Sequence, residues 1–156
     1  MIRLARPDDV SAILQMIKDL ADYERSLDEV QTTEEDLQEA LFAERPSVSI
    51  HVVEEQGELI GYAMWFVSFS AWVGRPGIWL VDLYVRPDQR GHGFGKQLLQ
   101  TLASICVERR YGRLEWKALD WNQPAIDFYM GLGAKPLADW TTYQLVGDAL
   151  HSVANS

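Results

Sequence analysis

Cysteine is nearly absent from the chain: Cys106 is the only one among 156 residues, so no disulfide can form within one copy. It lies between Ile105 and Val107 in a stretch expected to be helical, where a packed thiol is a better interpretation than a nucleophile. Long apolar runs are absent too, since none approaches the roughly 18 residues of a membrane-spanning helix. With 47% hydrophobic residues, we expect a sizeable core and no membrane association.

Positive charge is scarce, with 14 lysines and arginines against 23 acidic residues and a formal net charge of −9. Nucleic-acid binding needs a basic footprint, so it is not expected, and a cationic partner is favoured only weakly. The acidic residues crowd the N-terminal helical region: Asp19, Asp22, Glu24, Asp28, Glu29, Glu34, Glu35, Asp36 and Glu39. Such a run is usually a solvated helix surface, although it could also receive a polycation.

The length of the chain is typical of one domain, and it contains no repeat, linker or low-complexity segment. We therefore predict a single domain over residues 1–156. Residues 1–4 have the pattern of a first strand and not of a charged-then-apolar leader, so we expect a cytoplasmic protein.

The spacing of apolar residues predicts a mixed sheet with helices. Pro7 suits the first turn of a helix with apolar residues at helical spacing, and Thr32 with Glu35 predicts a capping box for a second helix ending near Ala43. A hairpin turn is expected at residues 55–58, and a parallel neighbour of 78–85 is expected at 113–119 after a right-handed crossover. The expected strands are 49–54, 59–68, 78–85, 113–119, 134–137 and 141–146, followed by a frayed end at 147–156.

The most informative stretch is an apolar strand, residues 78–85, that runs into the glycine-rich loop 86–96 and then into an amphipathic run to Arg110. The first turn of a helix has N–H groups without helical partners and the positive end of a dipole, which together bind phosphate. Gly91, Gly93 and Gly95 carry no Cβ, so backbone N–H groups can close on a pyrophosphate. A loop that uses glycine merely to turn is the plain alternative.

Spacing separates three kinds of phosphate loop. A nucleotide-hydrolysing loop needs Ser or Thr after its lysine, whereas Gln97 follows Lys96. A dinucleotide loop needs a different glycine spacing, although Glu115, 20 residues past Gly95, keeps that interpretation open in weakened form. The remaining pattern, Arg90-x-x-Gly93-x-Gly95, resembles the acyl-CoA loop of the GNAT superfamily of N-acetyltransferases.

A second motif strengthens this resemblance. Residues 122–129 are similar to the family's Asn-x-x-Ala-x-x-Phe-Tyr segment, and a glycine turn follows at 131–134. Pro124 suits the start of a helix, and Gly131 or Gly133 can end it in a left-handed conformation. Within the superfamily the chain most resembles the diamine acetyltransferases, the spermidine/spermine and thialysine enzymes, through residues 20–24, 61–64, 71–74, 80–85 and 120–124. It departs from them at Val81, where they carry a glutamate.

The resemblance implies an α/β fold with a mixed, mostly antiparallel central sheet flanked by helices, and a homodimer. It also implies transfer of an acetyl group from the cosubstrate acetyl-CoA, without a metal, to the primary amine of a small cationic substrate. That substrate would be a polyamine, a diamine or a thialysine-like amino acid, and its amine would attack the thioester directly.

The family's functional positions carry over onto residues of this chain. Tyr129 matches the acid that protonates the leaving thiolate, and Asp82 is a catalytic candidate beside Val81. The implied substrate-binding residues are Tyr23, Glu24, Trp72 and Asp82. The implied acetyl-CoA-binding residues are Leu83, Tyr84, Val85, Arg90, Gly91, His92, Gly93, Phe94, Gly95, Lys96, Asn122, Pro124 and Ala125.

The general base is open at this point because Val81 cannot accept a proton. The role can fall to Asp82, Glu24, Glu115, a chain of ordered water, or no single residue. Strict strand alternation places Asp82 on the face opposite Val81 unless a bulge turns it. Two other functions stay open: acetylation of protein lysines or N-termini, and acyl-CoA sensing without catalysis.

Overall fold

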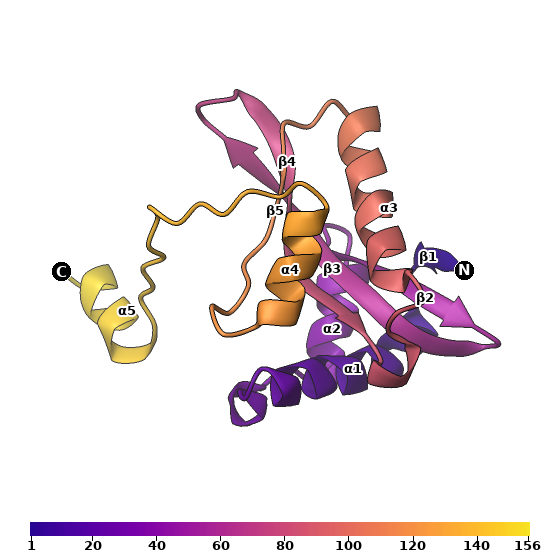
Figure 1. Cartoon of the computed structure of the whole chain (residues 1–156). Helices are drawn as coiled ribbons and strands as arrows, with labels where there is room; N and C mark the ends of the chain where they lie inside the picture. The colour runs from indigo at the N-terminus through magenta and orange to yellow at the C-terminus, as the bar shows by residue number, and fades with distance from the viewer. The chain divides into compact units, whose positions relative to one another are not determined.

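The computed structural model describes residues 1–156, which form two compact units, residues 1–119 and residues 120–156 (Figure 1). The first unit contains β1 (Ile2–Leu4), α1 (Val10–Tyr23), α2 (Glu34–Phe42), β2 (Ser49–Glu55), β3 (Glu58–Ser70), β4 (Arg75–Val85), α3 (Phe94–Glu108) and β5 (Leu114–Glu115). The second contains α4 (Gln123–Gly131) and α5 (Gly147–Ala154). No helix is both long enough and apolar enough to cross a membrane.

The sheet has the order β1-β2-β3-β4-β5, and every neighbouring pair is antiparallel except the parallel pair β4 and β5. This confirms the predicted mixed, mostly antiparallel architecture. The hairpin between β2 and β3 turns at Gln56 and Gly57, whose φ angles of 52° and 82° are the two positive values that a tight hairpin turn requires.

The main core lies between the sheet and the first two helices. Helix α1 buries Val10, Ile13 and Met16 against Ile50 and Tyr62 of the sheet. The opposite face of the sheet is covered by α3, whose buried residues are Leu98, Leu99, Leu102 and Cys106 (Figure 1). The buried thiol of Cys106 agrees with the packing role expected from its apolar neighbours.

The starts of the first two helices differ slightly from the prediction. Pro7 lies in a short 3-10 turn, Pro7–Asp9, that leads into α1. The capping box of α2 is formed by Thr33 and Asp36, one residue later than predicted: the Thr33 hydroxyl accepts from the Asp36 N–H at 3.1 Å, and the Asp36 carboxylate accepts from the Thr33 N–H at 2.9 Å. Thr32 and Thr33 each have an acidic residue three positions later, so the sequence pattern alone could not distinguish the two possible starts of the helix.

The prediction was wrong for the end of the chain. Residues 134–137 and 141–146 form no strands, residues 147–154 form α5 instead of a frayed end, and the strand expected at 113–119 is reduced to β5. A strand needs a neighbour for its backbone hydrogen bonds, so β-prone residues alone do not make one. The second unit contains no strand that could act as that neighbour.

Candidate active site

A bulge in β4 determines where Asp82 lies. Met64 of β3 pairs with Asp82, and the next residue, Trp65, pairs with Leu80, so Val81 has no cross-strand partner. Met64 and Trp65 are neighbours in a strand and lie on opposite faces, so Leu80 and Asp82 do too, although they are two residues apart. This answers the question that alternation left open: the extra residue puts Asp82 on the face that carries α1.

Beyond the bulge, one edge of β4 has no strand beside it. Strand β5 pairs only with Ile78 and Trp79, and no other strand pairs with this edge as β4 continues to Val85. An exposed strand edge presents backbone N–H and C=O groups that an extended ligand can use. Leu83, Tyr84 and Val85, all predicted to bind acetyl-CoA, belong to this stretch.

The glycine loop connects the end of β4 to the start of α3. Gly91 and Gly93 have φ angles of 83° and 85°, in the left-handed region that disfavours residues with a Cβ. Gly93 is the N-cap of α3, and the first backbone bond inside the helix runs from the Gln97 N–H to the Gly93 carbonyl at 3.0 Å. The N–H groups of the first turn, at Phe94, Gly95 and Lys96, therefore have no helical partner, which is what the predicted phosphate site requires.

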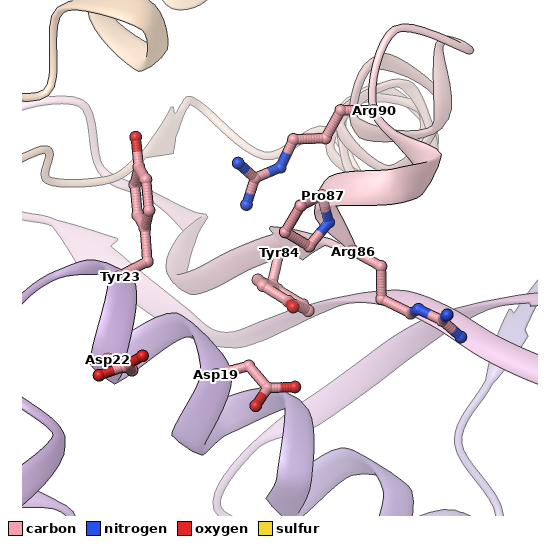
Figure 2. A pocket seen from close by; sticks show the side chains of 7 residues that line it. All are labelled: Asp19, Asp22, Tyr23, Tyr84, Arg86, Pro87 and Arg90. Atoms are coloured by element: carbon pink, nitrogen blue, oxygen red, sulfur yellow. The ribbon is translucent and has the colours of Figure 1, made fainter.

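A pocket of about 430 Å³ lies between α1 and the segment that follows β4 (Figure 2). Its lining residues are Asp19, Asp22, Tyr23, Tyr84, Arg86, Pro87 and Arg90. Arg90 donates from Nε to the Val85 carbonyl at 3.0 Å, and its Cζ lies 5.2 Å from the centre of the Tyr23 ring. Arg90, predicted for the acetyl-CoA loop, thus points its side chain into the pocket, where it meets Tyr23 from the predicted substrate segment.

Two carboxyl groups and a phenol form a cluster beside this pocket. The hydroxyl of Tyr62, a fully buried residue of β3, donates to Asp82 Oδ2 at 3.0 Å. Burial raises the pKa of Asp82, while the hydrogen bond from Tyr62 acts in the opposite direction. Burial also raises the pKa of Glu24, the C-cap of α1, and the charge of Asp82 adds to this effect. The structure therefore brings together the predicted residues Asp82 and Glu24 and adds Tyr62, which the sequence had not indicated.

Comparison with known proteins identifies the family. The model of the acetyltransferase (GNAT) family matches residues 13–134 of this chain. The chain belongs to the GNAT family. It is accordingly an amine N-acetyltransferase, and GNAT acetyltransferases use acetyl-CoA as cosubstrate. Thialysine N-epsilon-acetyltransferase of Bos taurus is 35% identical over 99% of this chain and 96% of its own length.

Two further proteins extend the comparison. L-ornithine N5-acetyltransferase of Arabidopsis thaliana is 27% identical over 97% of this chain and 86% of its own length. An integron cassette protein from the mobile metagenome of V. cholerae has a solved structure that superposes with a TM-score of 0.82 at 26% identity, covering 100% of this chain and 98% of the other.

The second GNAT motif forms α4 in the unit of residues 120–156. Asn122 is the N-cap, Pro124 is the second residue of the helix, and the chain leaves the helix through Gly133 with a φ of 89°. Tyr129 packs its ring 5.6 Å from that of Phe128, and its carbonyl accepts the Ala134 N–H at 3.2 Å. The local helix thus matches the motif, while the roles of Tyr129, Asn122, Pro124 and Ala125 stay predictions.

Two other candidates from the sequence lie outside the pocket of Figure 2. Trp72 lies in the turn between β3 and β4 and is 86% exposed. Glu115 lies on β5, opposite Trp79, and forms an ion pair with Arg113 at 3.6 Å. Neither residue lines the pocket. The structure contains no group of three or more His, Cys, Asp or Glu side chains arranged to hold a metal ion.

Proposed function

We propose that this protein moves an acetyl group from acetyl-CoA to the primary amine of a small cationic acceptor, by direct attack of the amine on the thioester. The acceptor class is a polyamine, a diamine or a thialysine-like amino acid. The observation that carries the proposal is the pairing, within residues 1–119, of a phosphate-type glycine loop that follows β4 with the carboxyl groups of Asp82 on β4 and Glu24 at the end of α1. The activities of the thialysine and ornithine relatives support it.

The backbone of this chain suits the coenzyme portion of acetyl-CoA. The phosphates would bind at residues 90–96 and the first turn of α3, and the extended arm would lie along the open edge at Leu83, Tyr84 and Val85. Asn122, Pro124 and Ala125 would contribute from α4. When bound, acetyl-CoA supplies a thioester whose carbonyl is activated toward an amine. Backbone N–H groups of the central strand would stabilise the oxyanion that forms.

Proton removal is assigned to Asp82, supported by Glu24. An alkyl ammonium has a pKa of about 10, so it must lose a proton before its nitrogen can attack. Val81 cannot take that proton, whereas the raised pKa of Asp82 brings this carboxyl nearer the working pH, where a base is most effective. Both carboxylates also attract the ammonium group electrostatically. Tyr129 would then supply a proton to the departing thiolate.

We also propose a domain organisation, a location and an oligomeric state for the enzyme. We infer a single acetyltransferase domain over residues 1–156, a cytoplasmic location and a homodimer, in which Trp72 borders the substrate cleft. Aromatic side chains are enriched at protein interfaces, and the β3–β4 hairpin exposes Phe69 and Trp72, at 67% and 86%. Light scattering at micromolar concentration should give twice the mass of one chain, and a monomer would remove the dimer from the proposal.

A panel of amines tests the reaction. The protein is mixed with acetyl-CoA and polyamines, diamines, diamino acids or a lysine-containing peptide, and release of free thiol is followed. Turnover of small amines supports the proposal, and preference for the peptide would favour a protein acetyltransferase. Tight binding of acetyl-CoA without acetylation of any amine would show a sensor instead of an enzyme.

A further inference from the structure

A buried histidine and a buried tryptophan form a pair on the face of the sheet that α3 covers. Ile50 and Val52 of β2 face α1, so His51 between them faces α3. Trp65 of β3 lies diagonally across from His51, since His51 pairs with Ala63, two residues before Trp65. Trp65 Nε1 donates to His51 Nδ1 at 3.1 Å, and the ring planes lie at 20° with their centres 6.0 Å apart. His51 is thus a buried titratable group that the proposed chemistry does not use.

This hydrogen bond requires one protonation state of His51. An indole N–H can only donate, so Nδ1 must accept, and the imidazole must be neutral with its proton on Nε2. Burial lowers the pKa of His51 below the ordinary histidine value, and the positive charge of Arg109 at the C-cap of α3 acts in the same direction. Protonation would place a second donor on Nδ1, opposite the indole N–H of Trp65, and would break the bond.

The groups around His51 do not favour the protonated ring. Arg109 is the charged group that acts on it, and Cys106 is the titratable side chain that α3 buries on this face. The cross-strand partners of His51 are Leu4 of β1 and Ala63 of β3, and neither can titrate or accept a proton from the ring. The surroundings therefore keep His51 neutral at neutral pH, which keeps the hydrogen bond to Trp65 intact.

Trp65 is also the residue of β3 at which the bulge begins. It pairs with Leu80, whereas Met64 pairs with Asp82, and the extra residue Val81 lies between these two pairs. The bulge requires Trp65 and Leu80 to stay on the face that carries α3 while Asp82 turns to the opposite face. Without the bulge, strand alternation would place Asp82 on the same face as Leu80, away from α1. A bond that holds Trp65 in place therefore also holds the register that sets Asp82.

We propose that His51 and Trp65 are positioning residues for Asp82: their hydrogen bond keeps the bulge in β4 that turns this carboxylate to the acceptor side, and only neutral His51 can make that bond. This inference rests on the proposed role of Asp82 in acetyl transfer. Because the pKa of His51 is lowered by folding, the unfolded chain takes up the proton first as the pH falls. The stability that the pair contributes is therefore fully present above about pH 6.5 and declines below that value.

Replacement of His51 separates its acceptor atom from its titration. His51→Leu removes the acceptor, so kcat at about pH 8 should fall roughly 5-fold, the factor that one hydrogen bond contributes, with the KM for acetyl-CoA unchanged. His51→Asn keeps an acceptor oxygen near the position of Nδ1 but cannot titrate, so it should restore most of kcat and melt without the loss of stability below about pH 6.5. His151→Asn, which removes an exposed imidazole from α5, is the control and should match the wild-type protein in both respects.

A double-mutant cycle tests whether the pair acts through Asp82. Trp65→Phe removes the donor but keeps an aromatic ring, and it should lower kcat about as much as His51→Leu does. Combined with Asp82→Asn, either change should have little further effect on kcat, because the carboxylate that the pair positions is gone. Losses that multiply in the double variants would overturn the proposal and leave the pair with a general packing role. Wild-type kcat in both His51→Leu and Trp65→Phe would overturn it as well.

NMR observes the bond without requiring turnover. In protein with ¹⁵N-labelled tryptophan, the indole signal of Trp65 is identified by its absence from Trp65→Phe. It should shift as the pH falls from about 7.5 to about 4.5 in the wild-type protein and should stay in place in His51→Asn. A signal that shifts equally in both proteins would overturn the proposed link to His51. Failure to acetylate any amine would remove the proposed function, and with it the role of the pair in positioning a base, even where this titration is seen.

Discussion

Of the two regions proposed to bind substrates, one is built mainly from backbone groups and the other from side chains. The acetyl-CoA region consists mainly of backbone: two glycines with positive φ, the first turn of α3 and the open edge of β4. The acceptor region consists of side chains, with Tyr62 donating to Asp82 and with Tyr23 and Glu24 at the end of α1. Changes of side chain should therefore damage acceptor chemistry while sparing acetyl-CoA binding, and changes of backbone conformation should do the reverse.

The largest effect is expected at Tyr129, if this side chain protonates the leaving thiolate. Tyr129→Phe should lower kcat by about 100-fold or more, the usual scale for a positioned acid, while the affinity for acetyl-CoA stays nearly unchanged. Steady-state kinetics and calorimetric titration with acetyl-CoA measure the two quantities. Unchanged turnover would leave Tyr129 with only its packing against Phe128.

Asp82→Asn is the corresponding change on the acceptor side. The amide cannot accept the proton, so turnover should fall by roughly 100-fold and the rising limb of the pH profile should change, again without loss of acetyl-CoA binding. Glu24→Gln should have a smaller effect of the same kind, because Glu24 supports Asp82 electrostatically. If both variants keep full turnover and the same pH dependence, neither carboxylate is the base and proton removal passes to water.

Gly93→Ala addresses the backbone-built region. A residue with a Cβ at a φ of 85° costs roughly 1–2 kcal/mol, and no side chain is close enough to make the space itself the obstacle. Relief of this strain would move the loop, so we expect acetyl-CoA affinity to fall by about 10-fold with little change in the pH profile. Acetyl-CoA at about 100 times its Kd should add roughly 2.7 kcal/mol to the stability of the wild-type protein and less to the variant, as thermal melting would show. Equal affinities would mean that the coenzyme binds elsewhere.

The smallest effect, and the sharpest test of the carboxyl cluster, is expected for Tyr62→Phe. The Tyr62 hydrogen bond lowers the pKa of Asp82 against the effect of burial, so its removal should raise that pKa. A base must be deprotonated to act, so the rising limb of activity should move to higher pH. The other groups that face this cluster are Glu24 from the end of α1 and Tyr84 from β4, and both are unchanged in the variant.

The control for this variant is Tyr111→Phe, which removes a hydroxyl that accepts from Arg109 at 3.4 Å outside the cluster. It should leave the pH profile in place. Melting temperatures of both variants separate a loss of fold from a change in titration. A merely structural role for Tyr62 would lower stability without moving the pH profile.

The sequence predicted the strand, the glycine loop and the helix of the backbone-built region because these elements are contiguous in the chain. Glycine spacing, a preceding apolar strand and a following amphipathic helix all lie within residues 78–110, and each has its own conformational reason. The side-chain region depends on contacts between distant segments. The pairing of Tyr62 with Asp82 spans 20 residues and follows from the register of β3 on β4, which the bulge shifts by one. Composition and periodicity do not reveal that shift in register. They also do not show that residues 134–146 lack a strand partner.

The bulge at Val81 also bears on how the family can diversify. A residue that has no cross-strand partner can be exchanged without disturbing the pairing of its neighbours, and Val81 is 42% exposed, so substitution there does not require repacking of the core. The side chain at position 81 can therefore change while the pairing of β3 with β4 stays the same. A glutamate could be lost there, or regained, while Met64, Tyr62 and Asp82 keep their places, and the chemistry of proton removal could pass between neighbouring residues without a change of architecture.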